Sequence, residues 1–250
     1  MDSKFRRLFG GVGSFVFYIL CMIVFVITLV YVVVNGILGE FGPGLVAHWV
    51  LVSFLGAGLL HIGMFCRTVL RVKIPTYLDI YLLVLVVAHF FLGTIFRAFD
   101  FIPFYDKALH TLSGGALTVV GFSIANLFLS QKQKDGKPYL NPNVPYKKTF
   151  LAMFALGFSL MLGLVWEFFE FIVDTIGGTN MQRWQDRPAT EYFQGSGLID
   201  TMMDLIVHTI GAIIIVVFVV WWLKKHPHSQ GPFITRYKVD DTCHKCDISN

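Results

Sequence analysis

Charged residues are scarce in this sequence of 250 residues. Asp, Glu, Lys and Arg make up 14% of the chain, whereas a soluble domain carries about 25%. Hydrophobic residues make up 55%, and they gather in long runs of the length that crosses a bilayer. The composition therefore indicates an integral membrane protein. The formal net charge of +4 comes mainly from loop lysines and gives no sign of a nucleic-acid partner.

Several familiar site motifs are also missing. The sequence contains no HExxH zinc-protease motif, no P-loop and no paired Glu-x-x-His sequences of the di-iron bundle type. One Cys-x-x-Cys, formed by Cys243 and Cys246, has no second pair to complete a structural zinc site. Cys21 and Cys66 lie in apolar segments, which is typical of core residues. No standard motif therefore names the chemistry of this protein.

Six apolar stretches predict six transmembrane helices. They cover residues 14–37, 45–66, 76–98, 105–129, 149–174 and 200–223. Basic residues precede the first stretch, as in a signal peptide, but its length is that of a full span and no small-residue cleavage site follows, so we expect it to be retained. The predicted fold is an all-α bundle of six transmembrane helices in residues 1–225, followed by a polar cytoplasmic tail in residues 226–250.

Lys and Arg residues are divided unevenly between the two sides of this six-span topology. The N-terminus, the loops 67–73 and 130–148 and the C-terminal tail carry sixteen of them, and the opposite loops carry four. Because cytoplasmic loops are rich in Lys and Arg, the bias predicts that both termini lie in the cytoplasm. The fourth and sixth spans then begin at the outer face of the membrane, and the fifth span ends there.

Eight ionisable residues interrupt the last three predicted spans, all near their outer ends. They are Asp106, His110, Glu167, Glu170, Asp174, Asp200, Asp204 and His208. Within each span they recur every three or four residues, so each group lies on one helix face. A charged group inside a lipid span costs about 2.5–3.5 kcal/mol on insertion scales. We therefore expect these groups to be paired, hydrated or bound to a ligand.

Two imidazoles and several carboxylates form a set of groups that suits Zn, Mn or Fe. The best candidate ligands are His110, Glu167, Asp204 and His208, followed by Asp106, Asp174 and Asp200, and the best candidate general base is Glu170. Simpler explanations remain open. Asp106 and Asp200 stand at predicted helix starts, where an acid serves as a cap, and the deeper residues can be polar contacts between helices. Protonated carboxylates, or the basic partners Lys107, Arg183 and Arg187, are the rivals of a metal ion.

The residues of the last three spans also occur in a characteristic order. The order runs Tyr105-Asp106-Lys107-Ala108-Leu109-His110, Gly114, Trp166-Glu167-Phe168-Phe169-Glu170, Gln182, Asp200-Thr201-Met202-Met203-Asp204 and Gly211-Ala212. It resembles the YjdF-like family of bacterial membrane-spanning proteins and, more distantly, the VanZ-like family. His208 stands where a small or amide residue is expected. The resemblance implies a bacterial cell membrane, and its VanZ-like part implies a cell-envelope or glycopeptide-resistance setting, but neither family implies a mechanism.

The leading hypothesis from the sequence is a membrane-embedded, cation-dependent hydrolase or transferase. It would act at the outer face on a membrane lipid or a lipid-linked cell-envelope precursor. A proton- or cation-coupled transporter that uses the same acids as a relay is the first alternative, and a non-catalytic envelope-stress or resistance factor is the second. The inner halves of the last three spans contain few polar residues beyond Ser123, Asn126 and Ser159, which favours the enzyme. The sequence indicates neither the substrate nor the oligomeric state.

Overall fold

The computed structural model describes residues 5, 8–129, 131–132, 138–139, 147–185, 195–225 and 235–236. Within these residues, six helices are long and apolar enough to cross a membrane. They are Val12–Ile37, Pro43–Thr68, Thr76–Ile95, Tyr105–Asn126, Lys148–Gly177 and Ser196–Lys225. Each agrees with a predicted span to within a few residues, so the prediction of an all-α, six-span membrane protein is confirmed.

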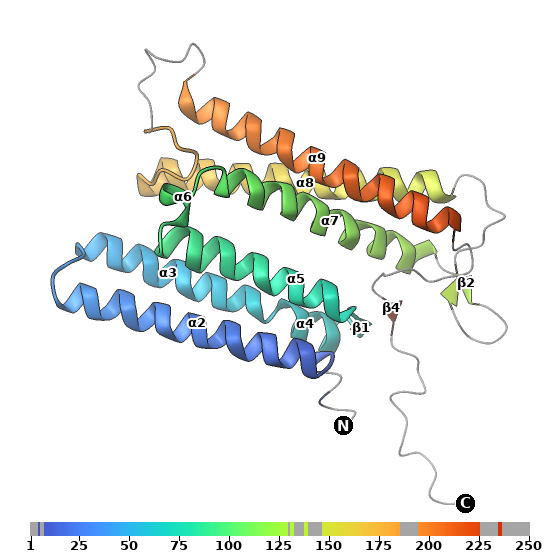
Figure 1. The fold of residues 1–250 in the computed structure, drawn as a ribbon, viewed down its shortest axis with the longest axis horizontal. Coiled ribbons are helices and arrows are strands. Elements are labelled where there is room, and N and C mark those ends of the chain that lie inside the picture. The colour runs from blue at the N-terminus through green and yellow to red at the C-terminus, as the bar shows by residue number, and fades with distance from the viewer. Residues whose placement is uncertain are drawn as a thin grey trace, which may run out of the picture. The chain divides into compact units, whose positions relative to one another are not determined.

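The helices belong to two compact units (Figure 1). The first unit contains α2 (Val12–Ile37), α3 (Pro43–Leu60), α4 (Ile62–Thr68), α5 (Thr76–Val86), the π-helix η1 (Val87–Ile95) and α6 (Ala98–Phe101). The second contains α7 (Tyr105–Leu129), α8 (Lys147–Gly177) and α9 (Ser196–Lys225). Short antiparallel strands pair β1 (Val72–Lys73) with β4 (Thr235–Arg236), and β2 (Gln131–Lys132) with β3 (Pro138–Tyr139). Apart from β4, the predicted polar tail lies outside the described residues.

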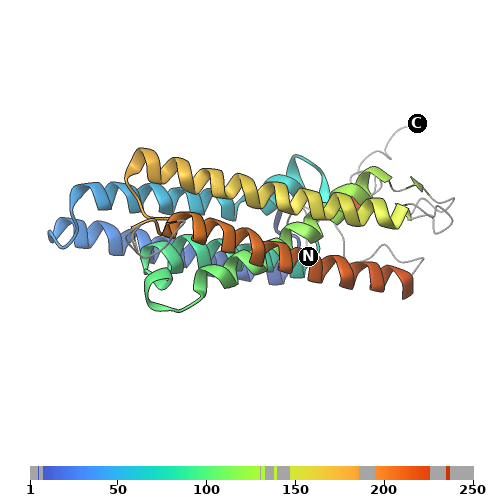
Figure 2. The same cartoon turned by 90° about the horizontal axis from the view of Figure 1, so that it is seen from above.

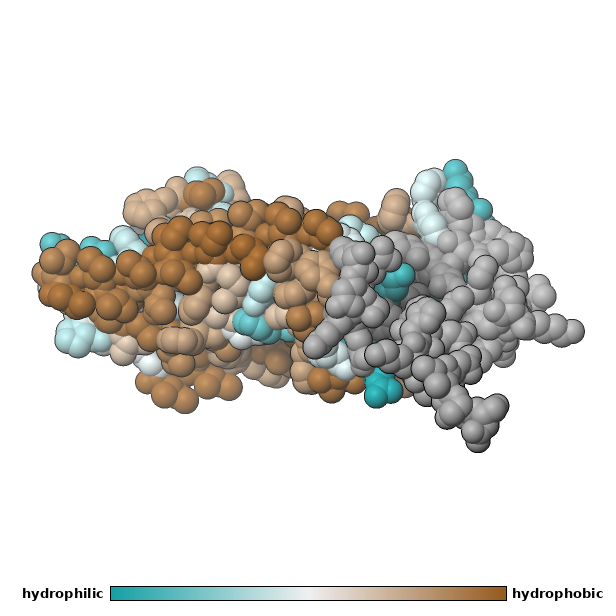
Figure 3. All heavy atoms as spheres, turned by 90° about the horizontal axis from the view of Figure 1, so that it is seen from below, coloured by the Kyte–Doolittle hydropathy of each residue, from teal (hydrophilic) through white to brown (hydrophobic). Residues whose placement is uncertain are grey.

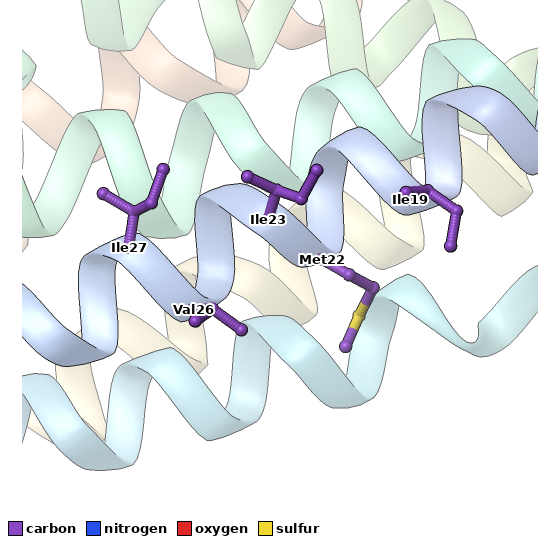
Figure 4. A pocket seen from close by; sticks show the side chains of 5 residues that line it. All are labelled: Ile19, Met22, Ile23, Val26 and Ile27. Carbon is purple, nitrogen blue, oxygen red and sulfur yellow. The ribbon is translucent and has the colours of Figure 1, made fainter.

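The surfaces of the helices are apolar where lipid would cover them. Figure 3 shows hydrophobic side chains over most of the visible helical surface. On α2, Ile19, Met22, Ile23, Val26 and Ile27 line an open, shallow hollow of about 340 Å³ (Figure 4). Aliphatic side chains at such positions are what a bilayer requires of a spanning helix. The hollow offers no polar group with which to bind a ligand, so it carries no chemistry.

In the second unit, α7 packs against both α8 and α9, and its contact with α9 is the more extensive. Figure 2 shows α8 and α9 running side by side. Two glycines make the contact between α7 and α9 possible. A Cβ atom on Gly114 would collide with the backbone carbonyl oxygen of His208, and one on Gly211 would collide with that of Thr111. Small residues commonly permit such a close approach of helices in membranes.

The first unit contains a buried ion pair that the sequence analysis missed. Arg67 Nη1 lies 2.9 Å from Asp79 Oδ1, and the two side chains are 4% and 6% exposed. Arg67 Nε also donates a hydrogen bond of 3.0 Å to the carbonyl oxygen of Leu8, which ties the start of the chain to the ends of two spans. The prediction assigned Arg67 to a loop and overlooked Asp79. The available signal was a pair of opposite charges at the adjoining ends of consecutive spans.

Candidate functional site

The centre of the candidate site is the ammonium group of Lys107, close to the start of α7. Its Nζ atom lies 3.1 Å from Asp106 Oδ2, 2.5 Å from Asp200 Oδ1 and 2.8 Å from Asp204 Oδ2. Lys107 is thus a counter-ion shared by one carboxylate of α7 and two of α9. The capping explanation fails for Asp200, because α9 begins at Ser196 and the Asp200 carboxylate binds Lys107. The carboxylate of Asp106 likewise binds Lys107.

His110 lies one turn further along α7, between the carboxylates of three helices. Its Nε2 atom is 3.6 Å from Asp106 Oδ1 and 3.7 Å from Asp204 Oδ1, while its Nδ1 atom is 3.7 Å from Glu167 Oε1. Glu167, His110 and Asp204 are 3%, 6% and 1% exposed. The three side chains therefore converge on a common centre, and none of them faces lipid. These separations are too long for hydrogen bonds.

The spacing around His110 Nε2 matches that of atoms bound to one cation. Two ligand atoms at about 2.1 Å from a tetrahedral zinc ion lie about 3.4 Å from each other. One nitrogen of His110 and one oxygen each from Asp106 and Asp204 all lie within 4.8 Å of one another, and the three residues form the one such group among the described residues. The same two carboxylates use their other oxygens to bind Lys107. The lysine therefore leaves one oxygen of each carboxylate directed toward His110.

Several buried oxygen atoms at this centre have no hydrogen-bond partner among the described residues. They are Asp204 Oδ1, Asp200 Oδ2 and both carboxylate oxygens of Glu167. The Thr201 hydroxyl lies beside Glu167 without meeting hydrogen-bond geometry. Leaving a buried polar atom unpaired costs about 1–3 kcal/mol, and more for a charged group. Such atoms at one place call for an explanation, such as a bound proton, a water molecule or an ion.

Glu170, the candidate general base, lies close to the same cluster. It is 4% exposed, and its Oε1 atom accepts a hydrogen bond of 2.8 Å from the indole nitrogen of Trp166. It interacts electrostatically with Glu167, Asp106 and Asp204. The described part of the cluster therefore brings together five carboxylates, those of Asp106, Glu167, Glu170, Asp200 and Asp204, around the ammonium of Lys107. This excess of negative charge in a buried setting needs protons or a further cation to balance it.

Asp174 is a predicted ligand that the structure places in a different role. Its Oδ1 atom accepts hydrogen bonds from the Thr179 hydroxyl at 2.5 Å and from the Met181 backbone nitrogen at 2.8 Å. Its Oδ2 atom accepts one from the Gln182 backbone nitrogen at 2.9 Å. Both oxygens are therefore occupied in organising the loop after α8. An acid at the C-terminal end of a helix, which the macrodipole disfavours, is explained by these donors.

His208, the other predicted imidazole ligand, is engaged one turn below Asp204 on α9. Its Nε2 atom lies 3.0 Å from both the hydroxyl and the carbonyl oxygen of Ser159 on α8. The Ser159 hydroxyl donates a hydrogen bond of 2.9 Å to the carbonyl oxygen of Gly114. The His208 ring also lies against Gly163, where an added Cβ atom would stand 3.0 Å from it. These contacts match the alternative interpretation of His208 as a polar link between helices.

From the sequence, Lys107 was expected only to balance the charge of the acids in general. In the structure it binds three of their carboxylates directly. The signal available was its position between Asp106 and the deeper His110 on a helix whose neighbours carry acids. Of the other two basic partners, Arg183 interacts electrostatically with Asp200, and Arg187 lies outside the described residues. The hydrogen bond from Gln182 to Thr201 was also missed. It joins a loop to a helix, and residue spacing along a helix does not predict such a contact.

The family model of predicted membrane proteins called DUF2238 matches residues 17–225. The chain belongs to this family. It is the YjdF family, so the YjdF-like resemblance is confirmed, whereas the VanZ-like part of the resemblance finds no support. No curated protein and no solved structure matches the chain. The family description says that its members are membrane proteins and gives no activity.

Proposed function

We propose that the protein binds a divalent transition metal at the outer ends of α7, α8 and α9, and uses it as a membrane-embedded hydrolase or transferase. The observation that carries the proposal is the set of three separations at His110: 3.6 Å and 3.7 Å from Nε2 to carboxylate oxygens, and 3.7 Å from Nδ1 to a third. Zn, Mn and Fe all accept mixed imidazole and carboxylate ligands.

The proposal gives each residue of the cluster a distinct task. His110 Nε2, Asp106 Oδ1 and Asp204 Oδ1 would hold the ion, which leaves a coordination position open, as in catalytic zinc sites. The ion would activate a bound water or polarise the substrate. Glu167 would orient the imidazole through Nδ1, and Lys107 fixes the second oxygens of both aspartates. Glu170 would accept a proton, and Asp200 would hold Lys107 in place.

The most direct test is to measure the metal content of the purified protein. We expect about one equivalent of Zn, Mn or Fe in the wild type after resupply and mild dialysis, and at least tenfold weaker binding in Asp204→Asn, which removes a charged ligand. The matched control is Asp100→Asn, because Asp100 is an exposed acid paired with Arg97. Metal analysis by mass spectrometry decides the matter, and a wild type that retains no stoichiometric metal after resupply would overturn the proposal.

The proposed substrate is a membrane lipid or a lipid-linked cell-envelope precursor, reached from the outer leaflet. The assignment to the outer leaflet is supported by the excess of Lys and Arg in the loops that would be cytoplasmic, which favours both termini on the inner side. The buried ion pairs do not weaken the bias. Arg67 and Lys107 are both held in ion pairs. Leaving them out removes one basic residue from the cytoplasmic side and one from the outer side, so the bias remains.

Labelling of single cysteines in intact cells tests this orientation. In a background without native cysteines, a cysteine at position 187 should react with a membrane-impermeant maleimide added outside, and one at position 134 should react only after lysis. Both positions lie outside the described residues, in the two loops that join α7 to α8 and α8 to α9. The reverse pattern would place the site at the inner face.

A proton relay is the second candidate function, and buried polar residues inward of the cluster favour it. They are Thr118, Ser123, Asn126, Ser159 and His208. However, the hydroxyls of Thr118, Ser123 and Ser159 donate to backbone carbonyl oxygens. The first two of these bonds lie within α7, and the third joins α8 to α7. Protons held in backbone hydrogen bonds are not available to pass along a chain, so these residues support a structural role more strongly than a relay.

A further inference from the structure

We infer that Gln182 and Thr201 are positioning residues that act through Glu167 to orient the His110 imidazole toward the cation position. The inference rests on the proposed metal site. It adds residues outside the ligand set that control the orientation of the His110 ligand. It assigns a role to the start of the loop that follows α8.

The first part of the loop, residues 178–185, is held in a defined shape by its own contacts. Asp174 accepts hydrogen bonds from Thr179, Met181 and Gln182. The indole nitrogen of Trp184 donates to the Thr179 carbonyl oxygen at 2.8 Å. These bonds fix the backbone at Gln182, and so they decide where its side chain can reach. Asp174 thus contributes to the site indirectly, through the loop.

The Gln182 side chain reaches α9 just beside Asp200. Its Nε2 atom donates a hydrogen bond of 2.8 Å to Thr201 Oγ1. Because Oγ1 accepts this bond, the hydroxyl proton of Thr201 is left to point elsewhere. Thr201 lies beside Glu167, whose two buried oxygens have no hydrogen-bond partner among the residues described. A hydrogen bond from the Thr201 hydroxyl to Glu167 would satisfy one of these two oxygens.

Glu167 then biases, through its charge, which nitrogen of His110 carries the proton. Glu167 Oε1 lies 3.7 Å from Nδ1, on the side of the ring opposite the two aspartates. A carboxylate there favours the tautomer with a proton on Nδ1, and this leaves the lone pair of Nε2 directed between Asp106 and Asp204. Thr201 and Gln182 hold Glu167 in that place. The chain of contacts therefore runs from the loop to α9, then to α8 and α7.

The experiment compares cation affinity in variants that differ by one hydroxyl. Thr201→Val keeps the shape of the side chain and removes the hydroxyl, and we expect it to weaken Co²⁺ or Zn²⁺ binding by about 10–100-fold. Thr201→Ser should bind as the wild type does, and Gln182→Ala should show a smaller loss in the same direction. Isothermal titration calorimetry of the purified full-length protein gives the affinities, and the visible spectrum of bound Co²⁺ reports the coordination geometry.

Thr209→Val is the matched control, because the Thr209 hydroxyl also lies on α9 but donates at 2.6 Å to the carbonyl oxygen of Leu205. It should leave the affinity and the Co²⁺ spectrum unchanged. If the wild type binds the ion and Thr201→Val binds it equally tightly, the positioning role is wrong while the metal site stands. The positioning role is also wrong if only the melting temperature of the metal-free protein changes. If the wild type binds no ion, the proposed function and this inference both fail.

Discussion

Replacing Lys107 by Met should lower the free energy of unfolding of the metal-free protein by at most about 3–5 kcal/mol, the cost of removing one partner from a buried ion pair, because Asp200 and Asp204 are buried while Lys107 itself is 23% exposed. The reason is that Asp106, Asp200 and Asp204 direct oxygens at the Lys107 ammonium from 3.1, 2.5 and 2.8 Å. Methionine fills a similar volume and leaves those three carboxylates without a positive charge. Denaturant unfolding in detergent micelles with a chelator measures the effect.

Adding a divalent cation to the same variant distinguishes a cluster that binds a metal ion from one whose carboxylates are protonated. If the cluster binds a metal, millimolar Mn²⁺ or Zn²⁺ should stabilise Lys107→Met more than the wild type, because the ion replaces the lost charge. Lys225→Met is the control, since Lys225 lies over the exposed ring of Trp221 at 4.4 Å, away from the carboxylates. A Lys107→Met protein as stable as the wild type in chelator would instead mean that the carboxylates are protonated.

The second large effect is expected in the first unit, at the ion pair of Arg67 and Asp79. Asp79→Leu should destabilise the protein by about 3–5 kcal/mol, because it leaves the guanidinium of Arg67 buried and unpaired. The double variant with Arg67→Met should recover most of that loss, since both charges are then gone. The melting temperatures of the three proteins in one detergent, compared with that of the wild type, provide the measurement.

Arg97 and Asp100 provide the comparison pair within the same unit. Their atoms are equally close, at 2.8 Å, but the side chains are 59% and 44% exposed. Asp100→Ala should therefore change the stability by less than about 1 kcal/mol. Equal effects of Asp79→Leu and Asp100→Ala would contradict the view that burial makes the first pair important.

The sequence allowed the six helices and the grouping of the acids to be predicted, because both depend on local pattern. Bilayer thickness fixes the length of an apolar run. Spacing of three or four residues places Glu167 and Glu170, or Asp200 and Asp204, on one face of a helix. Acids in adjacent spans must face one another, since lipid offers them no partner. The meeting of Glu167, His110 and Asp204 follows from these facts alone.

The individual partners could not be predicted, because they depend on helix rotation and on loop conformation. Spacing does not say whether a lysine near a helix end extends to the membrane surface or turns inward, as Lys107 does. Asp174 and His208 share faces with the other acids, yet the loop backbone binds one and Ser159 binds the other. The ion pair of Arg67 and Asp79 was not predicted for a similar reason. Arg67 lies in the last turn of a helix, but the sequence pattern placed it in a loop.

The reciprocal contacts of Gly114 and Gly211 restrict how this protein can move. The carbonyl oxygen of His208 lies against Gly114, and that of Thr111 lies against Gly211. If α9 slid along α7 by one residue, at least one of these carbonyls would strike a side chain. Asp106 and His110 on α7 and Asp204 on α9 therefore keep their separation in any cycle of opening and closing. α8 is held against both neighbours in the same way, since a Cβ atom on Gly121 would lie 2.8 Å from the Cα atom of Ala155 and Gly163 lies against the His208 ring. The geometry of the cluster is thus built into the packing of three helix backbones.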